Sequence, residues 1–301
     1  MNRIDLRTLA LLAVGVGAVS LSAPLIASTA VPALAIAFWR NAFATTAIAP
    51  IGLARQRPEL TSLTRRQLLG VVLAGCCLAA HFGFWITSLG MTSVASSTAL
   101  VSLQVIWVIA WDRSRGAVVG RSVVLGVLAA TAGAIVVSGV DLSISARALA
   151  GDALALVGGI AVAAYAVIGG RARQKLSTTT YTLICYGTCA VVLLVAALGR
   201  GQALTGFDRE DWLKLLLLTA TAQLLGHSVF NYLLGRLSPM ITSMAILLEI
   251  PGASLIAAAW LGQVPEAGAV VGLALILVGI AVVVRAAPDS GPPAERATAP
   301  A

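Results

Sequence analysis

The 301-residue sequence is 59% hydrophobic and only 11% charged, with a mean hydropathy of +0.96. One soluble core cannot enclose that much apolar side chain, so the composition excludes an ordinary soluble domain and predicts an integral membrane protein. The formal net charge of +8 would suggest nucleic-acid binding in a soluble protein, but the basic residues stand singly or in pairs between long apolar runs. We therefore expect membrane lipids as neighbours and no nucleic-acid partner.

Ten windows are long and apolar enough to span a bilayer, which requires about 20 residues. Their approximate limits are 7–27, 32–54, 68–89, 92–111, 118–139, 151–170, 178–198, 212–234, 238–261 and 266–286. The sequence thus predicts an all-α integral membrane fold with ten transmembrane helices. The first window could instead be a signal peptide cleaved after Pro32–Ala35, an alternative that the repeat described below argues against. Residues 287–301 are rich in Pro and Ala without periodicity, which predicts a disordered cytoplasmic tail.

Lysine and arginine are distributed unequally between the two sets of loops. With the amino terminus inside, fifteen of these residues fall in inner loops, and four, Arg147, Arg200, Arg209 and Lys214, fall in outer loops. The remaining one, Arg40, lies within the second span. Because cytoplasmic loops carry the excess of basic residues, we expect a multi-pass protein of the cell inner membrane with both termini in the cytoplasm.

The chain also contains an internal repeat. A shift of 146 residues superposes the only two histidines without a gap. The superposed pairs include His81 with His227, Gly126 with Gly272 and Gly133 with Gly279. Each half contains five spans, an odd number, so the second half enters the membrane from the opposite side. We expect two inverted five-helix repeats, residues 6–140 and 149–286, and the matched glycines of spans five and ten predict a dimerising or scaffolding pair, which leaves a homodimer open.

The cysteines give no sign of a metal site. Cys76, Cys77, Cys185 and Cys189 all lie inside apolar segments, without metal-ligand spacing or a clustered histidine or carboxylate partner. We interpret them as packing residues, and we expect no metal and no cofactor.

Polar side chains within the spans are the candidates for a functional site, because each is costly in hydrocarbon unless a partner or water compensates it. The candidate cavity residues are His81, Trp85, Ser97, Gln104, Gln223, His227, Asn231, Thr242 and Glu249. Gln223, His227 and Asn231 recur every four residues, which predicts one polar stripe on span eight. A structural alternative stays open for each histidine, as an interhelical hydrogen-bonding group, and for Glu249, as an acceptor beside backbone loosened by Pro251. Arg40 and Pro251 are interpreted as structural.

Two stretches, HFGFWITSLGMTSVASSTALV and GHSVFNYLLGRLSPMITSMAILLEIPG, together with Arg40 in AFWRNAFA, resemble the EamA family of the drug/metabolite transporter (DMT) superfamily. The resemblance covers about residues 6–286. It implies a central cavity lined by spans one, three, four, six, eight and nine, with many members acting as exporters of amino acids, sugars, nucleotide-linked metabolites, amines or drugs. The chain departs from the family at Gln104, where a proline is usual, and at Gly262–Gln263 in place of Gly-Glu.

The leading hypothesis is a secondary transporter, not an enzyme. It would move, and by the resemblance export, a small organic metabolite, amino acid or drug by alternating access around a midplane cavity. Proton coupling through Glu249 is left open. The alternatives are an intramembrane enzyme using His81, His227 and Glu249, although no H-E-x-x-H or G-x-S-x-G motif accompanies them, and a lipid or metabolite flippase or a passive channel.

Overall fold

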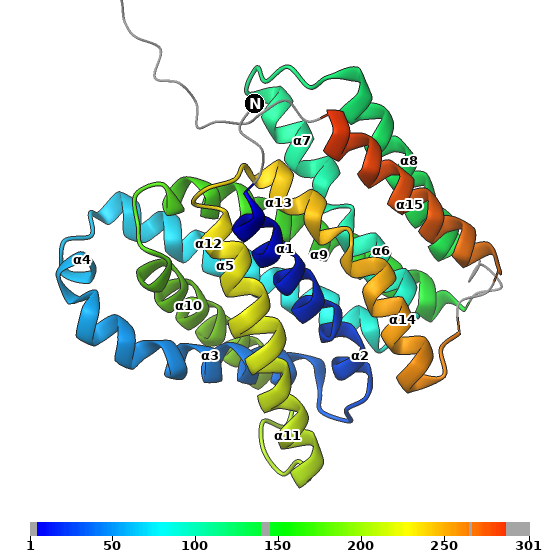
Figure 1. Ribbon diagram of the computed structural model, residues 1–301. Helices are drawn as coiled ribbons and strands as arrows, with labels where there is room; N and C mark the ends of the chain where they lie inside the picture. The colour runs from blue at the N-terminus through cyan, green and yellow to red at the C-terminus, as the bar shows by residue number, and fades with distance from the viewer. Residues whose placement is uncertain (1–4, 140–144, 265–266, 287–301) are drawn as a thin grey trace, which may run out of the picture.

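The computed structural model describes residues 5–139, 145–264 and 267–286, and within these residues the chain is helical, without a strand (Figure 1). The tail predicted for residues 287–301 lies outside the described part. The helices are α1 (Leu6–Ser20), α2 (Ser22–Ala27), α3 (Ala33–Arg55), α4 (Arg57–Thr61), α5 (Arg65–Leu89), α6 (Val94–Ser102), α7 (Gln104–Ser114), α8 (Arg121–Gly139), α9 (Ala146–Arg173), α10 (Thr178–Gly199), α11 (Arg209–Leu218), the π-helix η1 (Thr219–His227), α12 (Ser228–Leu233), α13 (Pro239–Ile246), α14 (Glu249–Leu261) and α15 (Ala267–Ala286).

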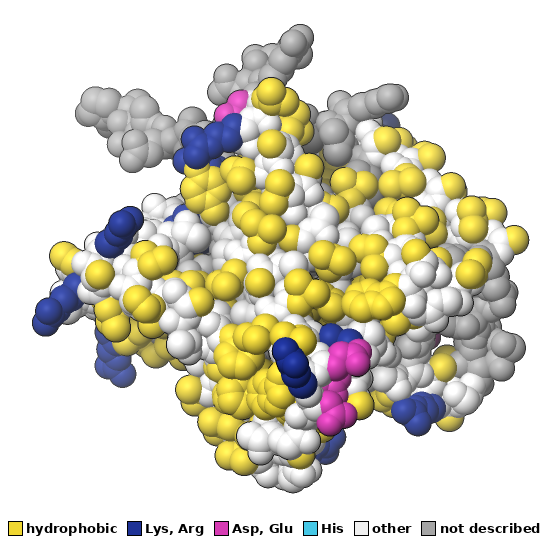
Figure 2. Space-filling model, turned by 60° about the horizontal axis from the view of Figure 1, so that its bottom comes forward, with side chains coloured by type: hydrophobic (Ala, Val, Ile, Leu, Met, Phe, Trp, Pro, Cys, Tyr) yellow, Lys and Arg dark blue, Asp and Glu magenta, His cyan; other side chains and the backbone are white. Residues whose placement is uncertain are grey.

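Eight helical segments of the described chain are long and apolar enough to cross a membrane. They are Leu6–Ala27, Ala33–Arg55, Arg65–Leu89, Val94–Ser114, Ala146–Arg173, Thr178–Gly199, Arg209–Leu233 and Pro239–Leu261. Two shorter apolar helices, Arg121–Val137 and Ala267–Val283, coincide with the fifth and tenth predicted windows. Hydrophobic side chains cover much of the outer surface, with charged groups in a few clusters (Figure 2). The prediction of an all-α, multi-pass membrane protein is therefore confirmed.

Several helices begin at a hydroxyl side chain that caps the first turn. Thr64 starts α5 with a capping box, since its side chain accepts from the backbone of Gln67 and the Gln67 side chain accepts from the backbone of Thr64. Ser145, Ser177 and Ser238 cap α9, α10 and α13 in the same way. These caps satisfy amide groups that a helix start leaves unpaired, and each contributes about 1 kcal/mol.

A carboxylate on the short helix α4 fastens the α3–α5 connection to the start of α10. Glu59 accepts hydrogen bonds from the Ser177 amide at 2.7 Å, from the Ser177 hydroxyl and from the Thr180 hydroxyl at 2.7 Å. Because Ser177 is also the cap of α10, the same side chain both begins that helix and holds the preceding connection. The contact joins segments more than a hundred residues apart.

Three membrane segments are broken partway along their length. The breaks fall at Leu21 between α1 and α2, at Leu103 between α6 and α7, and at Leu247–Leu248 between α13 and α14. Pro24 and Pro251 lie just after two of the breaks, where a residue without an amide hydrogen cannot continue the hydrogen-bond ladder. The break at Leu103 has no proline within it and is made by a tight turn, in which the Ile106 amide donates to the Leu103 carbonyl at 2.9 Å.

Helices α8 and α15 cross at glycines. A Cβ atom on Gly133 would lie 2.5 Å from the Gly272 carbonyl oxygen, and one on Gly126 would lie 2.6 Å from that of Gly279. Only residues without a side chain allow the two backbones to approach so closely. The glycines of the fifth and tenth windows thus face each other within one chain and form an internal scaffold.

Helices α3, α5, α9 and α10 enclose the main apolar core. Its largest fully buried members include Phe82, Leu78 and Leu193, together with Tyr181 and Tyr186. The four cysteines are unpaired thiols, and the two on α10, Cys185 and Cys189, are fully buried in this core.

Candidate functional site

A small cavity, which we call the central chamber, lies where the three broken segments meet. Its polar lining comes from Ser22, His81, Ser102, Gln104, His227 and Glu249, with Trp85 and Phe230 among the apolar walls. Its volume is about 40 Å³. A water molecule needs about 10–15 Å³ on this measure, so the chamber has room for about three waters in this conformation.

Three polar residues of the chamber each begin a helix directly after a break. Ser22 is the first residue of α2, Gln104 the first of α7 and Glu249 the first of α14. The start of a helix presents unpaired amide groups and a partial positive charge, which favours a carboxylate or another acceptor at that place. Broken helices that meet near the middle of a membrane are a common way to build a binding site for a polar solute.

The two histidines face each other across the chamber. Their ring centroids lie 6.5 Å apart. The Nδ1 atom of His81 lies 3.1 Å from the Gly158 carbonyl oxygen, so a neutral His81 with its proton on Nδ1 donates there and leaves Nε2 as an acceptor. The His81 ring also stacks on Trp85, with centroids 5.6 Å apart and planes 7° from parallel. This stack fixes one wall of the chamber.

Arg40 lies behind the chamber wall and is fully buried. Its Nε atom donates to Gln223 Oε1 at 2.9 Å, and its Nη1 atom donates to the Ser22 hydroxyl at 3.4 Å. Its guanidinium carbon lies 4.1 Å above the centre of the Phe82 ring. Within the described residues it forms no ion pair with Glu249. Arg40 therefore joins α3 to η1 and reaches the chamber through Ser22.

Several buried polar atoms around the chamber have no partner among the described residues. They are the Trp85 Nε1, Ser102 Oγ and Gln104 Oε1 atoms, together with the Arg40 Nη2 atom. The Glu249 carboxylate also makes no hydrogen bond or ion pair within the described part of the chain. An unpaired buried polar group costs free energy unless water or a ligand satisfies it, so this lining suits a polar guest with both donors and acceptors.

Five of the nine cavity residues named from sequence line the chamber: His81, Trp85, Gln104, His227 and Glu249. The other four do not line it, and each has a partner elsewhere. Ser97 Oγ lies 2.6 Å from Ser88 Oγ, and Thr242 Oγ1 donates to the Ser238 carbonyl at 3.2 Å. Gln223 binds Arg40 on one side and, through Nε2, donates to Asn41 Oδ1 at 3.1 Å on the other.

Asn231 belongs to a separate polar cluster. It accepts from the Tyr165 hydroxyl and donates to the Tyr186 oxygen at 3.0 Å. The segment Thr219–His227 is wound as a π-helix, so the four-residue spacing of Gln223, His227 and Asn231 does not place the three side chains against one neighbour. Instead each meets a different group.

Sequence reasoning missed Ser22, Ser102, Tyr165, Tyr186 and Asn41. Ser22 precedes Pro24 by two residues, which is a signal for a broken helix that could have been used. Asn41 follows Arg40 directly and is a second polar residue in the same span. The other three look like ordinary members of apolar helices, and only the packing reveals their positions.

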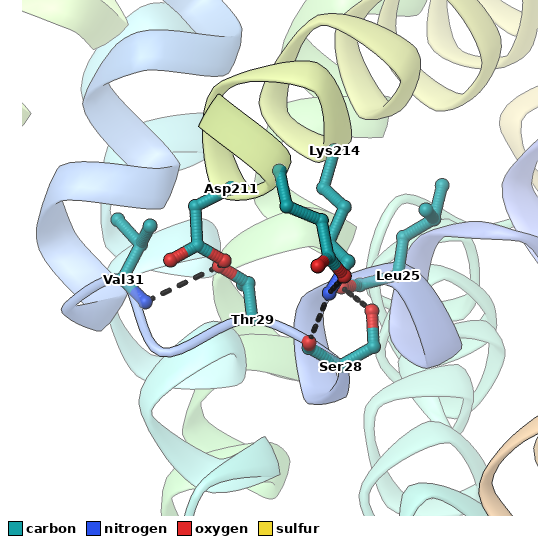
Figure 3. Close-up of polar contacts among 7 residues, drawn as sticks. Leu25, Ser28, Thr29, Val31, Asp211 and Lys214 are labelled. Atoms are coloured by element: carbon teal, nitrogen blue, oxygen red, sulfur yellow. Dashed lines mark hydrogen bonds and ion pairs between the residues drawn. The ribbon is translucent and has the colours of Figure 1, made fainter. Parts of the chain in front are cut away.

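The α11 side of the chamber is closed by contacts between α11 and the loop after α2 (Figure 3). The Thr29 hydroxyl donates to Asp211 Oδ1 at 2.6 Å, and the ammonium group of Lys214 donates to the Ser28 carbonyl at 2.7 Å. Lys214 also pairs with Glu210 at 2.7 Å. These contacts hold α2, and therefore Ser22, in place.

The other side of the chamber is closed by apolar side chains. Val108 of α7 and Ala163 and Val167 of α9 pack together, with Met240 of α13 against them. Along α7, Val108 lies one turn beyond Gln104 of the chamber. Beyond this apolar layer, a larger pocket of about 540 Å³ opens between α7, α9 and α13.

Comparison with known proteins places the chain among transporters. Residues 149–285 match the EamA-like transporter family, which confirms the resemblance to the EamA family of the DMT superfamily over that part of the chain. The fold is similar to a solved structure described as "Crystal structure of protein", with a TM-score of 0.72, 16% sequence identity, and coverage of 94% of this chain and 99% of that chain. At this identity the likeness shows the fold alone. A search of proteins with curated functions gave no match.

Proposed function

Since residues 149–285 belong to the EamA-like transporter family, we propose that the protein is a secondary transporter that moves a small organic molecule across the membrane by alternating access around the central chamber. The observation that carries this proposal is the position of Glu249 and the two histidines in a polar chamber formed at three helix breaks. Members of the family are transporters and not enzymes.

We propose further that residues 6–140 and 149–286 form two inverted repeats of five spans each. Two features support this arrangement. The breaks at Leu103 and at Leu247–Leu248 fall at corresponding places when the halves are shifted by 146 residues. The same shift exchanges the two glycine contacts, because the pair Gly126 and Gly279 becomes Gly272 and Gly133.

The proposed cytoplasmic side is the end with the larger pocket. Arg115, Arg171 and Arg236 lie there, whereas the α11 end pairs its basic Lys214 with Glu210 and adds Asp211. The positive-inside rule then assigns the pocket end to the cytoplasm, with both chain termini on that side. Solute would enter from the pocket once the layer of Val108 and its neighbours parts, and would leave past α11, which is the direction of export.

The chamber must expand to hold its solute. A volume of about 40 Å³ accommodates water but not an organic molecule. The described conformation is therefore closed on both sides. The unpaired groups of Ser102, Gln104 and Glu249 favour a solute that carries both hydrogen-bond donors and acceptors, such as an amino acid or another small polar metabolite or drug.

We propose that Glu249 carries the coupling proton. A carboxylate inside a membrane protein, without a partner in the described structure and at the chamber wall, can bind a proton when the chamber faces one side and release it on the other. Replacement Glu249→Gln keeps the shape but cannot exchange a proton.

The test is transport by purified protein in proteoliposomes, using a broad panel of metabolites and drugs in both directions, with and without a proton gradient. We expect movement of at least one compound, dependence on the proton gradient, and loss of that dependence in Glu249→Gln. Glu210→Gln, an exposed carboxylate outside the chamber, is the matched control and should behave like wild type. Unchanged proton dependence in Glu249→Gln would remove Glu249 as the carrier, and no transport of any compound would refute the transporter proposal.

A further inference from the structure

The large pocket at the α7–α13 end, here called the arginine pocket, is independent of the proposed chemistry of the central chamber. Arg115, Arg171 and Arg236 line it, with a single carboxylate, Asp112. The Gln174 amide and the Ser238 hydroxyl add further donors. Three guanidinium groups against one carboxylate leave an excess of positive charge, and guanidinium groups match the oxygen atoms of phosphate in geometry as well as in charge. The lining therefore favours a phosphate-bearing ligand.

Two of the arginines are held in place without being neutralised. The guanidinium carbon of Arg171 lies 5.2 Å from the centre of the Trp111 ring, and that of Arg236 lies 4.4 Å from the centre of the Tyr232 ring. Stacking on a ring uses the face of the guanidinium and leaves its N–H edges available. Within the described residues, neither side chain forms a hydrogen bond or an ion pair. The donors are thus oriented and unused.

An apolar groove of about 260 Å³ continues from the arginine pocket along α7 and α9. Trp111, Val167 and Arg171 line both hollows. On α9 the groove runs from Arg171 back to Ile160, a distance of about 16 Å at the helical rise of 1.5 Å per residue. The hydrocarbon of one bilayer leaflet is about 15 Å deep. The groove therefore has the length and the polarity of a site for one acyl chain.

We propose that the arginine pocket and this groove together bind an anionic phospholipid of the cytoplasmic leaflet, with its phosphate among the three guanidinium groups and one acyl chain along α9. A soluble phosphate compound would use the pocket and leave the groove empty. A zwitterionic lipid would bring its own cationic group toward the arginines, which favours an anionic headgroup. The bound lipid would join α7, α9 and α13, the same three helices that form the apolar layer over the chamber.

The experiment uses the full chain purified in detergent, with phosphatidylglycerol or phosphatidylcholine added in turn. Native mass spectrometry counts bound lipid, and the midpoint of thermal unfolding reports its effect on stability. We expect wild type to retain and be stabilised by phosphatidylglycerol but not phosphatidylcholine. Arg171→Gln and Arg236→Gln should each weaken apparent binding about fivefold, the effect of one basic residue near an anionic lipid surface. Arg113→Gln, at the same end but outside the pocket lining, is the matched control and should leave binding unchanged.

A second variant separates the acyl chain from the headgroup and remains useful if the arginine variants fail to fold. Ala164→Trp fills the groove while leaving the arginines intact. We expect it to weaken phosphatidylglycerol binding at least as much as either arginine variant. Equal binding of the two lipids, an equal loss in Arg113→Gln, or unaltered lipid binding in Ala164→Trp would overturn the proposal. Inorganic phosphate that displaces the lipid at the same concentration would overturn it as well.

Discussion

The crossing of α8 and α15 allows a sharp test of the fold through Gly133→Ala. The added methyl group would lie 2.5 Å from the Gly272 carbonyl oxygen and 2.9 Å from the Ile276 amide nitrogen, whereas ordinary van der Waals contact begins at 3.4 Å. Both obstructing atoms belong to the backbone, so no side-chain rotation relieves the clash and the helices must separate. Overpacking of this kind costs about 1–3 kcal/mol. We expect the free energy of unfolding to fall by that amount.

The matched control is Gly70→Ala on α5, where an added methyl group meets nothing within 4 Å. Replacement of a helical glycine by alanine at such a site stabilises by about 0.5–1 kcal/mol. Unfolding of both variants in the same detergent, followed by circular dichroism against temperature or denaturant, gives the comparison. The reasoning fails if Gly133→Ala is as stable as Gly70→Ala. Because Gly133 and Gly272 form one contact, the double alanine variant should lose less than the sum of the two single losses.

Two further predictions concern buried polar contacts away from the chamber lining. Gln223→Ala removes the acceptor of the Arg40 Nε–H group and should lower the free energy of unfolding by about 1.5–3 kcal/mol, measured by the same unfolding assay; an unchanged value would show that Arg40 is satisfied in another way. Burial by itself would raise the pKa of Glu59, but hydrogen bonds from Ser177 and Thr180 outweigh it and lower the pKa below the ordinary 4.5. The stability that Glu59 contributes is therefore complete above pH 4.5 and is lost as the pH falls through the lowered pKa. The difference in thermal midpoint between wild type and Glu59→Gln should close between about pH 5 and pH 3, and a constant difference would contradict the assignment.

The membrane helices could be predicted from sequence because they depend on composition over long windows. The breaks within them depend on single residues. Pro24 and Pro251 are visible in the sequence and could have placed two of the three breaks. The break at Leu103 has no such mark, since Gln104 follows it and neither residue disfavours a helix strongly. There the surrounding packing decides where the helix ends.

The candidate site was harder to predict because it depends on which side chains meet across the bundle. The repeat placed His81 and His227 at related depths, and the structure brings their rings to within 6.5 Å. Periodicity grouped Gln223 with His227, but Gln223 turns to Arg40 because a buried guanidinium needs an acceptor and η1 changes the helical register. Hydropathy and spacing do not contain such pairings, which are set by the helix on the other side of the contact.

The helix breaks connect the fold to the proposed transport. A continuous helix resists bending, whereas a segment broken at Leu21, Leu103 or Leu247–Leu248 can tilt there with little loss of hydrogen bonding. Ser22, Gln104 and Glu249 lie at these positions, so a solute that binds them would contact the hinges directly. Binding energy could then favour one tilt over another, which is the requirement for a ligand to shift a conformational equilibrium. We infer that the chamber expands by movement of α2, α7 and α14 about the three breaks, while α8 and α15 remain fixed to each other at their glycines.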